Sequence, residues 1–389
     1  MAKNKTERFA AGTAIGLLGG GQLARMLALA AHPMGASVHV LSENSSDPAA
    51  QVTGNWQRGS PLNEQDLRTF LSKVEVATFE SEFLNAELLM RIEGELACKI
   101  YPSPRLMGQL QDRLTQKNAL LTHELPTAPF ISVEAKTSSF SELQFFFKKH
   151  KRIVIKTRRG GYDGYGTFII RNSKQLAEFM QTAESQKNSS HGWIAENFVP
   201  FEKEMAVIVA RNIAGHIQFF PLVETYQENS RCLWVKGPCA MNYSVLQKKI
   251  KNFLDTINYV GVMGIEFFRS GKTLLINEIA PRVHNSGHYS QNALNESQFT
   301  YHIKCILGQT LPPAKCLTGG FAMVNLLGAK ELKPQQKPNW ARENVSSQIH
   351  WYGKSESRSG RKMGHINCTA STANSALSKA LEERRKFFI

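Results

Sequence analysis

The chain has 389 residues, of which 42% are hydrophobic and 20% are charged. This length predicts two or three domains, and the composition excludes a disordered chain, which would have too little apolar surface to fold. The formal net charge of +15 suits either a nucleic-acid surface or an enzyme for phosphorylated small molecules. We favour the enzyme and expect no nucleic-acid partner, because the densest basic clusters, at 148–152 and 358–362, lack the interleaved aromatic residues of single-strand binders.

Six cysteines are spread along the chain without a CxxC pair. This spacing argues against a zinc site and against a disulfide framework, and it fits reduced thiols. The N-terminal segment lacks a signal-peptide pattern, and no stretch is long and apolar enough to span a bilayer. We therefore expect a cytoplasmic protein without a membrane partner.

Strand and helix patterns alternate over residues 1–112 and predict a Rossmann-like domain with an open parallel sheet. Glycines 19–21 separate the first predicted strand from a helix that begins at Gln22. A glycine turn before a helix favours an anion, so a nucleotide-binding domain, including a dehydrogenase, and a purely structural domain both remain open. Glu80 and Glu82 follow a later strand, where they either line a ligand site or cap a helix.

The following segment, residues 99–130, predicts a Pro-containing turn and then one amphipathic helix that ends at LPTAP. We place the first domain boundary near residues 109–113.

A glycine-rich loop lies between two predicted strands in RIVIKTRRGGYDGYGTFII, residues 152–170. Lys156 stands in the first strand, and the loop has too many glycines for a two-residue hairpin turn. Loop amides and a lysine charge together suit phosphate groups, although this loop tops a hairpin and does not open a helix as a Walker motif does.

Predicted strands over 193–199 and 201–211 contain Glu196 and Glu204. Such carboxylates accept hydrogen bonds from the amino and hydroxyl groups of adenine and ribose, or they are solvated strand-end charges. A hairpin around Gly215 and an amphipathic helix follow.

Two strand-like runs around a Gly-Lys turn form the segment GIEFFRSGKTLLINEIAPRVHNSGH, residues 264–288. Glu266 stands in the first run, and Asn277 and Glu278 stand near the end of the second. A hairpin would bring these side-chain oxygens together, and magnesium prefers oxygen ligands. The segment therefore predicts a magnesium site.

The remaining chain predicts one helix over 290–308, a strand over 321–328 and a hairpin over 348–370. The bend of that hairpin carries Lys354, Arg361 and Lys362. Paired cations on a glycine-containing turn suit a phosphate, and a solvated basic turn is the alternative.

The order of these features resembles the ATP-grasp enzymes. RRGGYDGYG, NEIAPRVHNSGHYSQNA and GRKMGH are similar to motifs of the 5-(carboxyamino)imidazole ribonucleotide synthetase family of purine biosynthesis, and GGGQLARML, DRLTQK and YVGVMGIEFF extend the likeness over almost the whole chain. The resemblance implies an α/β chain with an ATP-grasp fold. Its parts would be a Rossmann-like domain (1–112), an ATP-grasp domain (113–302, with a lid subdomain 113–192 and a metal-binding subdomain 193–302) and a small β-rich C-terminal domain (303–389).

The resemblance also implies the chemistry. The family carboxylates 5-aminoimidazole ribonucleotide with bicarbonate and ATP, through carboxyphosphate, and releases ADP and phosphate. We therefore expect these three substrates, two Mg²⁺ ions that Mn²⁺ could replace, and a homodimer. Another ATP-grasp ligase, such as a formate-using glycinamide ribonucleotide transformylase, and a non-catalytic nucleotide-binding regulator remain alternatives.

Residue roles follow from the same resemblance. Glu266 and Glu278 would hold the metal ions. The catalytic site for bicarbonate or carbon dioxide would contain Arg282, His284 and Asn285. The ribonucleotide would contact Gln22, Glu80, Glu82, Tyr162, Asp163, Lys354, Arg361 and Lys362. ATP would contact Arg113, Lys156, Gly161, Tyr162, Asp163, Gly164, Tyr165, Gly166, Thr167, Glu196, Asn197, Phe198, Val199, Glu204, Gln227, Asn277 and Glu278.

Three stretches depart from the family pattern. Tyr165, Gly166 and Thr167 stand where a basic residue, Gly and Gln are usual, and Gln227 stands where a His is usual. TFESEFL replaces a more usual Glu-hydrophobic-Glu-Asn. These changes predict altered nucleotide contacts and a weakened or specialised enzyme with an intact metal site.

Overall fold

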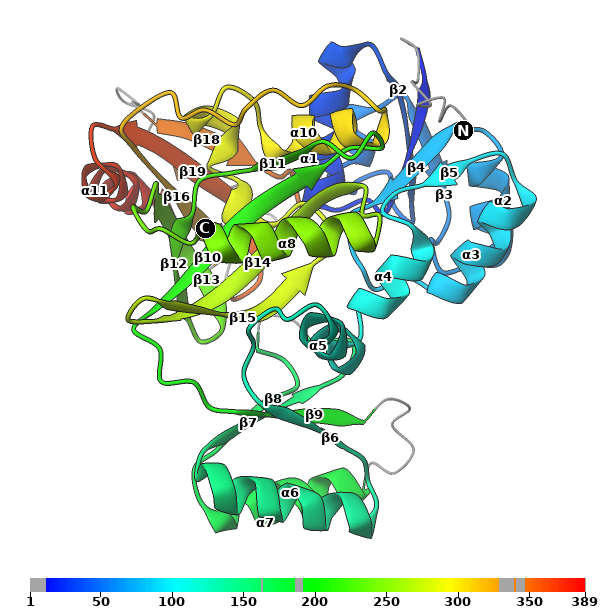
Figure 1. Ribbon diagram of the computed structural model, residues 1–389. Coiled ribbons are helices and arrows are strands. Elements are labelled where there is room, and N and C mark those ends of the chain that lie inside the picture. The colour runs from blue at the N-terminus through cyan, green and yellow to red at the C-terminus, as the bar shows by residue number, and fades with distance from the viewer. Residues whose placement is uncertain (1–11, 162–163, 186–191, 329–338, 341–346, 389) are drawn as a thin grey trace, which may run out of the picture.

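The structure is a computed structural model that describes residues 12–161, 164–185, 192–328, 339–340 and 347–388 (Figure 1). It contains three large sheets, and each sheet has helices packed against it (Figure 1). None of the described helices has both the length and the apolar character needed to cross a bilayer.

The N-terminal part is a five-stranded parallel sheet in the order β3-β2-β1-β4-β5. The strands are β1 (Ala14–Leu18), β2 (Ser37–Ser42), β3 (Asn55–Arg58), β4 (Val76–Phe79) and β5 (Lys99–Ile100). They alternate with the helices α1 (Gln22–Ala31), α2 (Glu64–Leu71) and α3 (Ala86–Glu95) and with the short 3₁₀ helices η1 (His32–Met34) and η2 (Ala50–Val52). The predicted parallel α/β sheet is confirmed.

The prediction of one helix after this sheet was wrong, because two helices are present, α4 (Pro104–Leu110) and α5 (Arg113–Thr122). The Asp112 carboxylate accepts a hydrogen bond from Leu114 N at 3.0 Å and so caps the start of α5. Gln116 Nε2 donates to Leu110 O at 2.7 Å and satisfies a carbonyl at the break. α5 therefore begins with Arg113.

A four-stranded antiparallel sheet has the order β6-β9-β7-β8, and this sheet with its two helices is called the lid below. Its strands are β6 (Phe130–Val133), β7 (Ile153–Thr157), β8 (Thr167–Ile170) and β9 (Trp193–Asn197), and α6 (Thr137–His150) and α7 (Ser173–Ser185) cover its outer face (Figure 1). The lid has a hydrophobic core of its own, which includes Leu143, Phe146, Leu176, Phe179 and Trp193. β7 and β8 form the predicted hairpin, with Lys156 opposite Thr167.

The largest sheet has nine strands in the order β15-β14-β10-β12-β13-β16-β19-β18, with β11 beside β10. The strands are β10 (Lys203–Arg211), β11 (Ile217–Phe219), β12 (Val223–Glu228), β13 (Arg231–Gly237), β14 (Gly261–Ser270), β15 (Thr273–Ala280), β16 (Gly320–Leu327), β18 (Ser347–Trp351) and β19 (Lys362–Ala370). β16 pairs with β13, so the C-terminal strands continue the same hydrogen-bonded sheet as the hairpin β14-β15.

Helices α8 (Ser244–Thr256) and α11 (Ala373–Arg384) also pack on this part, and β17 (Asn339–Trp340) pairs with β20 (Phe387–Phe388). The prediction of one helix over 290–308 was wrong. After the short η3 (Asn285–Gly287), the chain instead forms two helices, α9 (Ser290–Ala293) and α10 (Gln298–Ile306). Ser297 accepts a hydrogen bond from Thr300 N at 3.1 Å and so starts the second of them. α10 packs against α1, which joins the N-terminal part to the large sheet through one shared core.

Candidate active site

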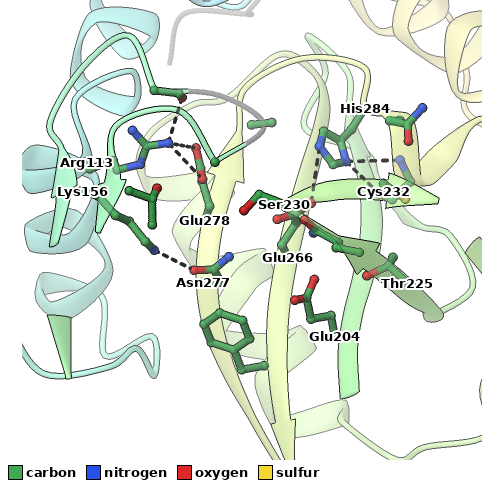
Figure 2. Close-up of a pocket in the computed structure, with 18 of the residues that line it drawn as sticks. Arg113, Lys156, Glu204, Thr225, Ser230, Cys232, Glu266, Asn277, Glu278 and His284 are labelled. Carbon is green, nitrogen blue, oxygen red and sulfur yellow. Dashed lines mark hydrogen bonds and ion pairs between the residues drawn. The ribbon is translucent and has the colours of Figure 1, made fainter. Parts of the chain in front are cut away.

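One cavity of about 750 Å³ is lined by residues from the N-terminal part, the lid and the large sheet, and Figure 2 shows some of them. The predicted site residues that line it are Gln22, Glu80, Glu82, Arg113, Lys156, Gly161, Gly164, Tyr165, Thr167, Glu196, Asn197, Phe198, Val199, Glu204, Gln227, Glu266, Asn277, Glu278, Arg282, His284, Asn285 and Lys362. Gly166, Lys354 and Arg361 do not line it, and Tyr162 and Asp163 lie outside the described residues. Residues far apart in the sequence are thus brought to one place.

The hairpin β14-β15 carries the predicted metal ligands. Glu266 pairs directly with Glu278, while Phe267 pairs with Ile276, so Asn277 is an extra residue in a β-bulge. In a regular strand Asn277 and Glu278 would point to opposite faces of the sheet, because side chains alternate. A bulge re-aims side chains, and here Asn277, Glu278 and Glu266 all line the cavity (Figure 2).

Carboxyl groups are crowded at this hairpin and at the adjacent strand β10. Burial, together with the neighbouring carboxyl groups of Glu278 and Glu204, raises the pKa of Glu266 to about 8. Burial also raises the pKa of Glu204 to about 7, although Lys156 and Gln227 oppose this shift. Carboxylates crowded in this way are stabilised by a bound cation.

The oxygen donors at this hairpin fit a magnesium ion that is coordinated partly by the protein and partly by a substrate. The described residues contain no group of three or more His, Cys, Asp or Glu side chains that could hold a metal ion by themselves. Glu266, Glu278 and the Asn277 amide supply oxygen ligands, and Mg²⁺ commonly completes its shell with water and phosphate oxygens.

Two cations face this hairpin from the lid side. Lys156 Nζ donates to Asn277 Oδ1 at 3.1 Å and forms an ion pair with Glu196 at 2.6 Å. Arg113 donates to the Gly161 carbonyl at 2.9 Å and lies 3.4 Å from a Glu278 oxygen (Figure 2). Arg113 therefore connects the glycine loop with the hairpin β14-β15.

The glycine loop closes over the cavity. Gly164 has a φ of +81°, and a Cβ atom on it would lie 2.4 Å from the Ser230 side chain in the turn between β12 and β13. Only a residue without a side chain fits both this backbone conformation and this close approach.

The end of the cavity near β9 is more apolar. Val154, Ile169, Phe268 and Ile276 line it together with Phe198, whose ring lies 3.6 Å from the Arg152 guanidinium carbon. Flat apolar walls with a few polar groups suit a planar base.

The loop after β15 places Arg282 and His284 at the opposite end. Arg282 makes a two-pronged ion pair with Glu82 of the N-terminal part. His284 Nδ1 lies 2.8 Å from Ser286 Oγ, and its Nε2 lies 3.7 Å from Glu266. Burial, Arg282 and Lys362 lower the pKa of His284 to about 3, so this imidazole is neutral.

Asn285 is fixed by a reciprocal pair of hydrogen bonds with Asn325 of β16, at 3.0 and 2.8 Å. This pair holds the loop against the large sheet.

Glu80 occupies the N-terminus of α1. Its carboxylate accepts hydrogen bonds from Gly21 N at 2.6 Å and Ala24 N at 3.3 Å. The backbone amides that would bind a dinucleotide phosphate are therefore taken by the protein itself, which argues against a dehydrogenase.

Lys354 and Arg361 lie beside the cavity in the turn between β18 and β19. Lys354 Nζ donates to the Lys362 carbonyl at 2.8 Å, and burial lowers the pKa of Lys354 to about 8. Arg361 donates to the Glu356 carbonyl at 3.0 Å. Gln51 donates to the Gly353 carbonyl at 2.7 Å and so ties the turn to the N-terminal part.

Comparison with known families matches the chain in three parts. Residues 13–111 match the ribonucleotide synthetase preATP-grasp domain, residues 118–299 the ATP-grasp domain and residues 322–379 the phosphoribosylaminoimidazole carboxylase C-terminal domain. The N5-carboxyaminoimidazole ribonucleotide synthase of Synechococcus elongatus is 38% identical over 369 residues, which are 93% of this chain and 90% of that protein. The chain belongs to the N5-carboxyaminoimidazole ribonucleotide synthase family.

Solved structures of the synthase family share the fold. The Staphylococcus aureus synthetase complexed with ADP aligns with a TM-score of 0.86 at 32% identity and covers 97% of this chain and 98% of its own. The Aspergillus clavatus synthase in complex with ADP and 5-aminoimidazole ribonucleotide aligns with a TM-score of 0.83 at 26% identity and covers 96% and 99%. The predicted family and ATP-grasp fold class are confirmed.

Sequence analysis missed several residues that line the cavity, among them Lys117, Arg152, Ser230 and Cys232. Lys117 carried a usable signal, because it stands four residues after Arg113 and residues with this spacing share one face of a helix. The other three come from strand ends and turns, whose position across the cavity depends on tertiary structure.

Proposed function

We propose that this chain is an ATP-dependent ligase that carboxylates 5-aminoimidazole ribonucleotide with bicarbonate, producing N5-carboxyaminoimidazole ribonucleotide, ADP and phosphate. The observation that carries the proposal is one cavity that combines phosphate-binding cations, a carboxylate hairpin and the Arg282 loop. The family relatives support it, since the Aspergillus clavatus synthase is complexed with ADP and 5-aminoimidazole ribonucleotide.

We place the nucleotide between the lid and the large sheet. The phosphate chain would lie beside Arg113 and Lys156, under the loop 161–167, and the base would lie between β9 and Phe268. Glu204 and Gln227 would accept and donate hydrogen bonds at the ribose. Glu266 and Glu278, with Asn277, would hold two Mg²⁺ or Mn²⁺ ions, which neutralise phosphate charge when bound.

Bicarbonate would bind at Arg282, His284 and Asn285, because a guanidinium and two neutral hydrogen-bonding groups suit a planar anion. A bicarbonate oxygen attacks the γ-phosphorus, the bond to ADP breaks, and carboxyphosphate forms. The amine nitrogen of the ribonucleotide then attacks the carboxyl carbon, phosphate leaves, and the nitrogen loses a proton. The closed glycine loop would keep water from the labile intermediate.

The ribonucleotide would enter from the N-terminal side. Gln22, Glu80 and Glu82 would line its site together with Tyr162 and Asp163. Its phosphate would meet the basic turn of Lys354, Arg361 and Lys362, because paired cations on a turn suit a phosphate group.

A coupled ADP assay tests this function. ADP should form only when ATP, bicarbonate and 5-aminoimidazole ribonucleotide are all present. ADP formation that is indifferent to the ribonucleotide would contradict the proposal, and formate in place of bicarbonate would indicate a different ATP-grasp ligase.

We also propose three domains with boundaries near residues 112 and 302, a homodimer and a cytoplasmic location. Light scattering should give twice the 43.5 kDa mass of one chain. The six free cysteines support a reducing compartment, and cell fractionation checks it.

A further inference from the structure

Lys117 of α5 is a buried cation to which the proposed reaction gives no role. Its side chain is 3% exposed, and its ammonium nitrogen lies 3.0 Å from Glu196 Oε1, 2.5 Å from Thr127 Oγ1 and 3.3 Å from Ile276 O. The ammonium group donates hydrogen bonds to Thr127 and Ile276 and forms an ion pair with Glu196. Lys117 is therefore held in the cavity wall and is not free to follow a ligand.

Glu196 connects Lys117 to the cation of the proposed nucleotide site. One of its oxygens faces Lys117 at 3.0 Å and the other faces Lys156 at 2.6 Å. Burial alone would raise the pKa of Glu196, but Lys156 and Lys117 outweigh burial and lower this pKa to about 2. Burial lowers the pKa of Lys117 and Glu196 opposes that shift, so each charge depends on the other.

The three side chains together carry two positive charges and one negative charge, which leaves one positive charge for a ligand. A pair of Lys156 and Glu196 alone would be neutral, and its carboxylate would repel a phosphate chain. In a partly dry site such charges interact strongly, because little water screens them. The net positive charge at the proposed nucleotide site thus depends on Lys117.

We propose that Lys117 is a positioning residue for ATP, which neutralises Glu196 so that the charge of Lys156 is available to the phosphate chain. This inference rests on the proposed placement of that chain beside Lys156. A purely structural role is the competing explanation, because Lys117 also joins α5 to β9 and β15.

Nucleotide binding to the full-length protein separates the two explanations. Calorimetry would measure the affinity for ADP with Mg²⁺ and for adenosine, which has the same base and ribose but no phosphate. The ratio of the two affinities reports the charge of the phosphate site. Lys117→Met should lower this ratio about tenfold by weakening ADP alone, since one unit of charge is lost.

The carboxylate partner supplies the matched control. Glu196→Gln should raise the ratio of ADP to adenosine affinity, and Lys117→Met combined with Glu196→Gln should return it to within about twofold of the wild type, because charges then cancel again. Thr127→Val removes one acceptor of the ammonium without changing any charge, and it should leave the ratio unchanged.

Several results would overturn the inference. An equal loss of ADP and adenosine affinity in Lys117→Met, a loss that Glu196→Gln does not reverse, or a loss in Thr127→Val of similar size would each show a structural role. If Lys117→Met does not fold, an unchanged ratio in Glu196→Gln still refutes the inference. Lys156→Met is measured in parallel, and unchanged ADP affinity there would instead refute the placement of the phosphate chain.

Discussion

The ion pair between Glu82 and Arg282 offers a quantitative test of how the N-terminal part supports the proposed bicarbonate site. The Arg282 and Glu82 side chains are 19% and 10% exposed, and two hydrogen bonds join them. Arginine cannot lose its proton, so Glu82→Ala would leave a largely buried, uncompensated charge. Breaking a buried pair in this way costs about 3–5 kcal/mol. We expect about 3 kcal/mol, because Arg282 keeps a hydrogen bond to the Val283 carbonyl and some contact with water.

Urea unfolding followed by tryptophan fluorescence measures this free energy. Glu82→Gln should lower the free energy of unfolding about half as much as Glu82→Ala does, because the amide keeps the shape of the side chain and one hydrogen-bond acceptor. Glu82→Ala combined with Arg282→Ala should be more stable than Glu82→Ala alone, since no buried charge is left without a partner. The reasoning is refuted if Glu82→Ala lies within about 1 kcal/mol of the wild type or if the double variant is no more stable.

The pKa of Glu82 predicts how the difference in unfolding free energy between the wild type and the Glu82 variants changes with pH. Burial alone would raise the pKa of Glu82, but Arg282 outweighs burial and lowers it. A lowered carboxyl pKa stabilises the folded state above the unfolded pKa of about 4.3, and that stabilisation is lost as the pH falls through the folded pKa. The gap between wild type and Glu82→Gln should therefore be constant from neutral pH to about 5 and should shrink in stronger acid.

Three further variants test other parts of the site. Glu266→Gln should reduce ADP formation by about a hundredfold or more and raise the Mg²⁺ requirement, because a charged metal ligand is lost; a variant with wild-type Mg²⁺ dependence would contradict the metal role. The pKa of Lys354, lowered by burial to about 8, predicts that kcat/KM for the ribonucleotide falls as the pH rises above 8, because the uncharged amine binds phosphate poorly. Lys354→Met should show a low kcat/KM without this alkaline fall. Gly164→Ala should lower kcat/KM about tenfold, since its φ of +81° and its approach to Ser230 exclude a side chain, and Ser230→Gly should restore part of the loss only if the approach matters.

Much of the secondary structure could be predicted from the local sequence pattern. The alternation of strands and helices before residue 100, the hairpin that carries Lys156 and the hairpin β14-β15 were all predicted from residue spacing and turn signals. Two predictions of a single helix were wrong, one for the helix within 99–130 and one for the helix over 290–308. The chain breaks these helices at Asp112 and Ser297. Both are good N-cap residues, so the sequence contained the signal, but continuous apolar spacing hid it.

The predicted metal ligands show where sequence reasoning reached its limit. Residue spacing predicted that the side chains of Glu266, Asn277 and Glu278 would lie together. In a regular strand, however, Asn277 and Glu278 would point to opposite faces of the sheet. The bulge at Asn277 resolves this conflict, and it depends on how β14 and β15 register against each other. The placement of Lys117 between Glu196 and Ile276 likewise depends on three elements that only the folded chain brings together.

The continuity of the nine-stranded sheet affects how the molecule moves. β15 with Glu278 and β19 with Lys362 belong to one network of backbone hydrogen bonds, whereas the lid has a separate core. A swing of the lid would carry Lys156 and the glycine loop as one body and would leave the spacing between the acidic hairpin and the basic turn unchanged. The distance between the proposed metal ligands and the proposed phosphate-binding turn is thus fixed by the large sheet. We expect amide hydrogen exchange to be slower in β10 and β14 than in the strands of the lid.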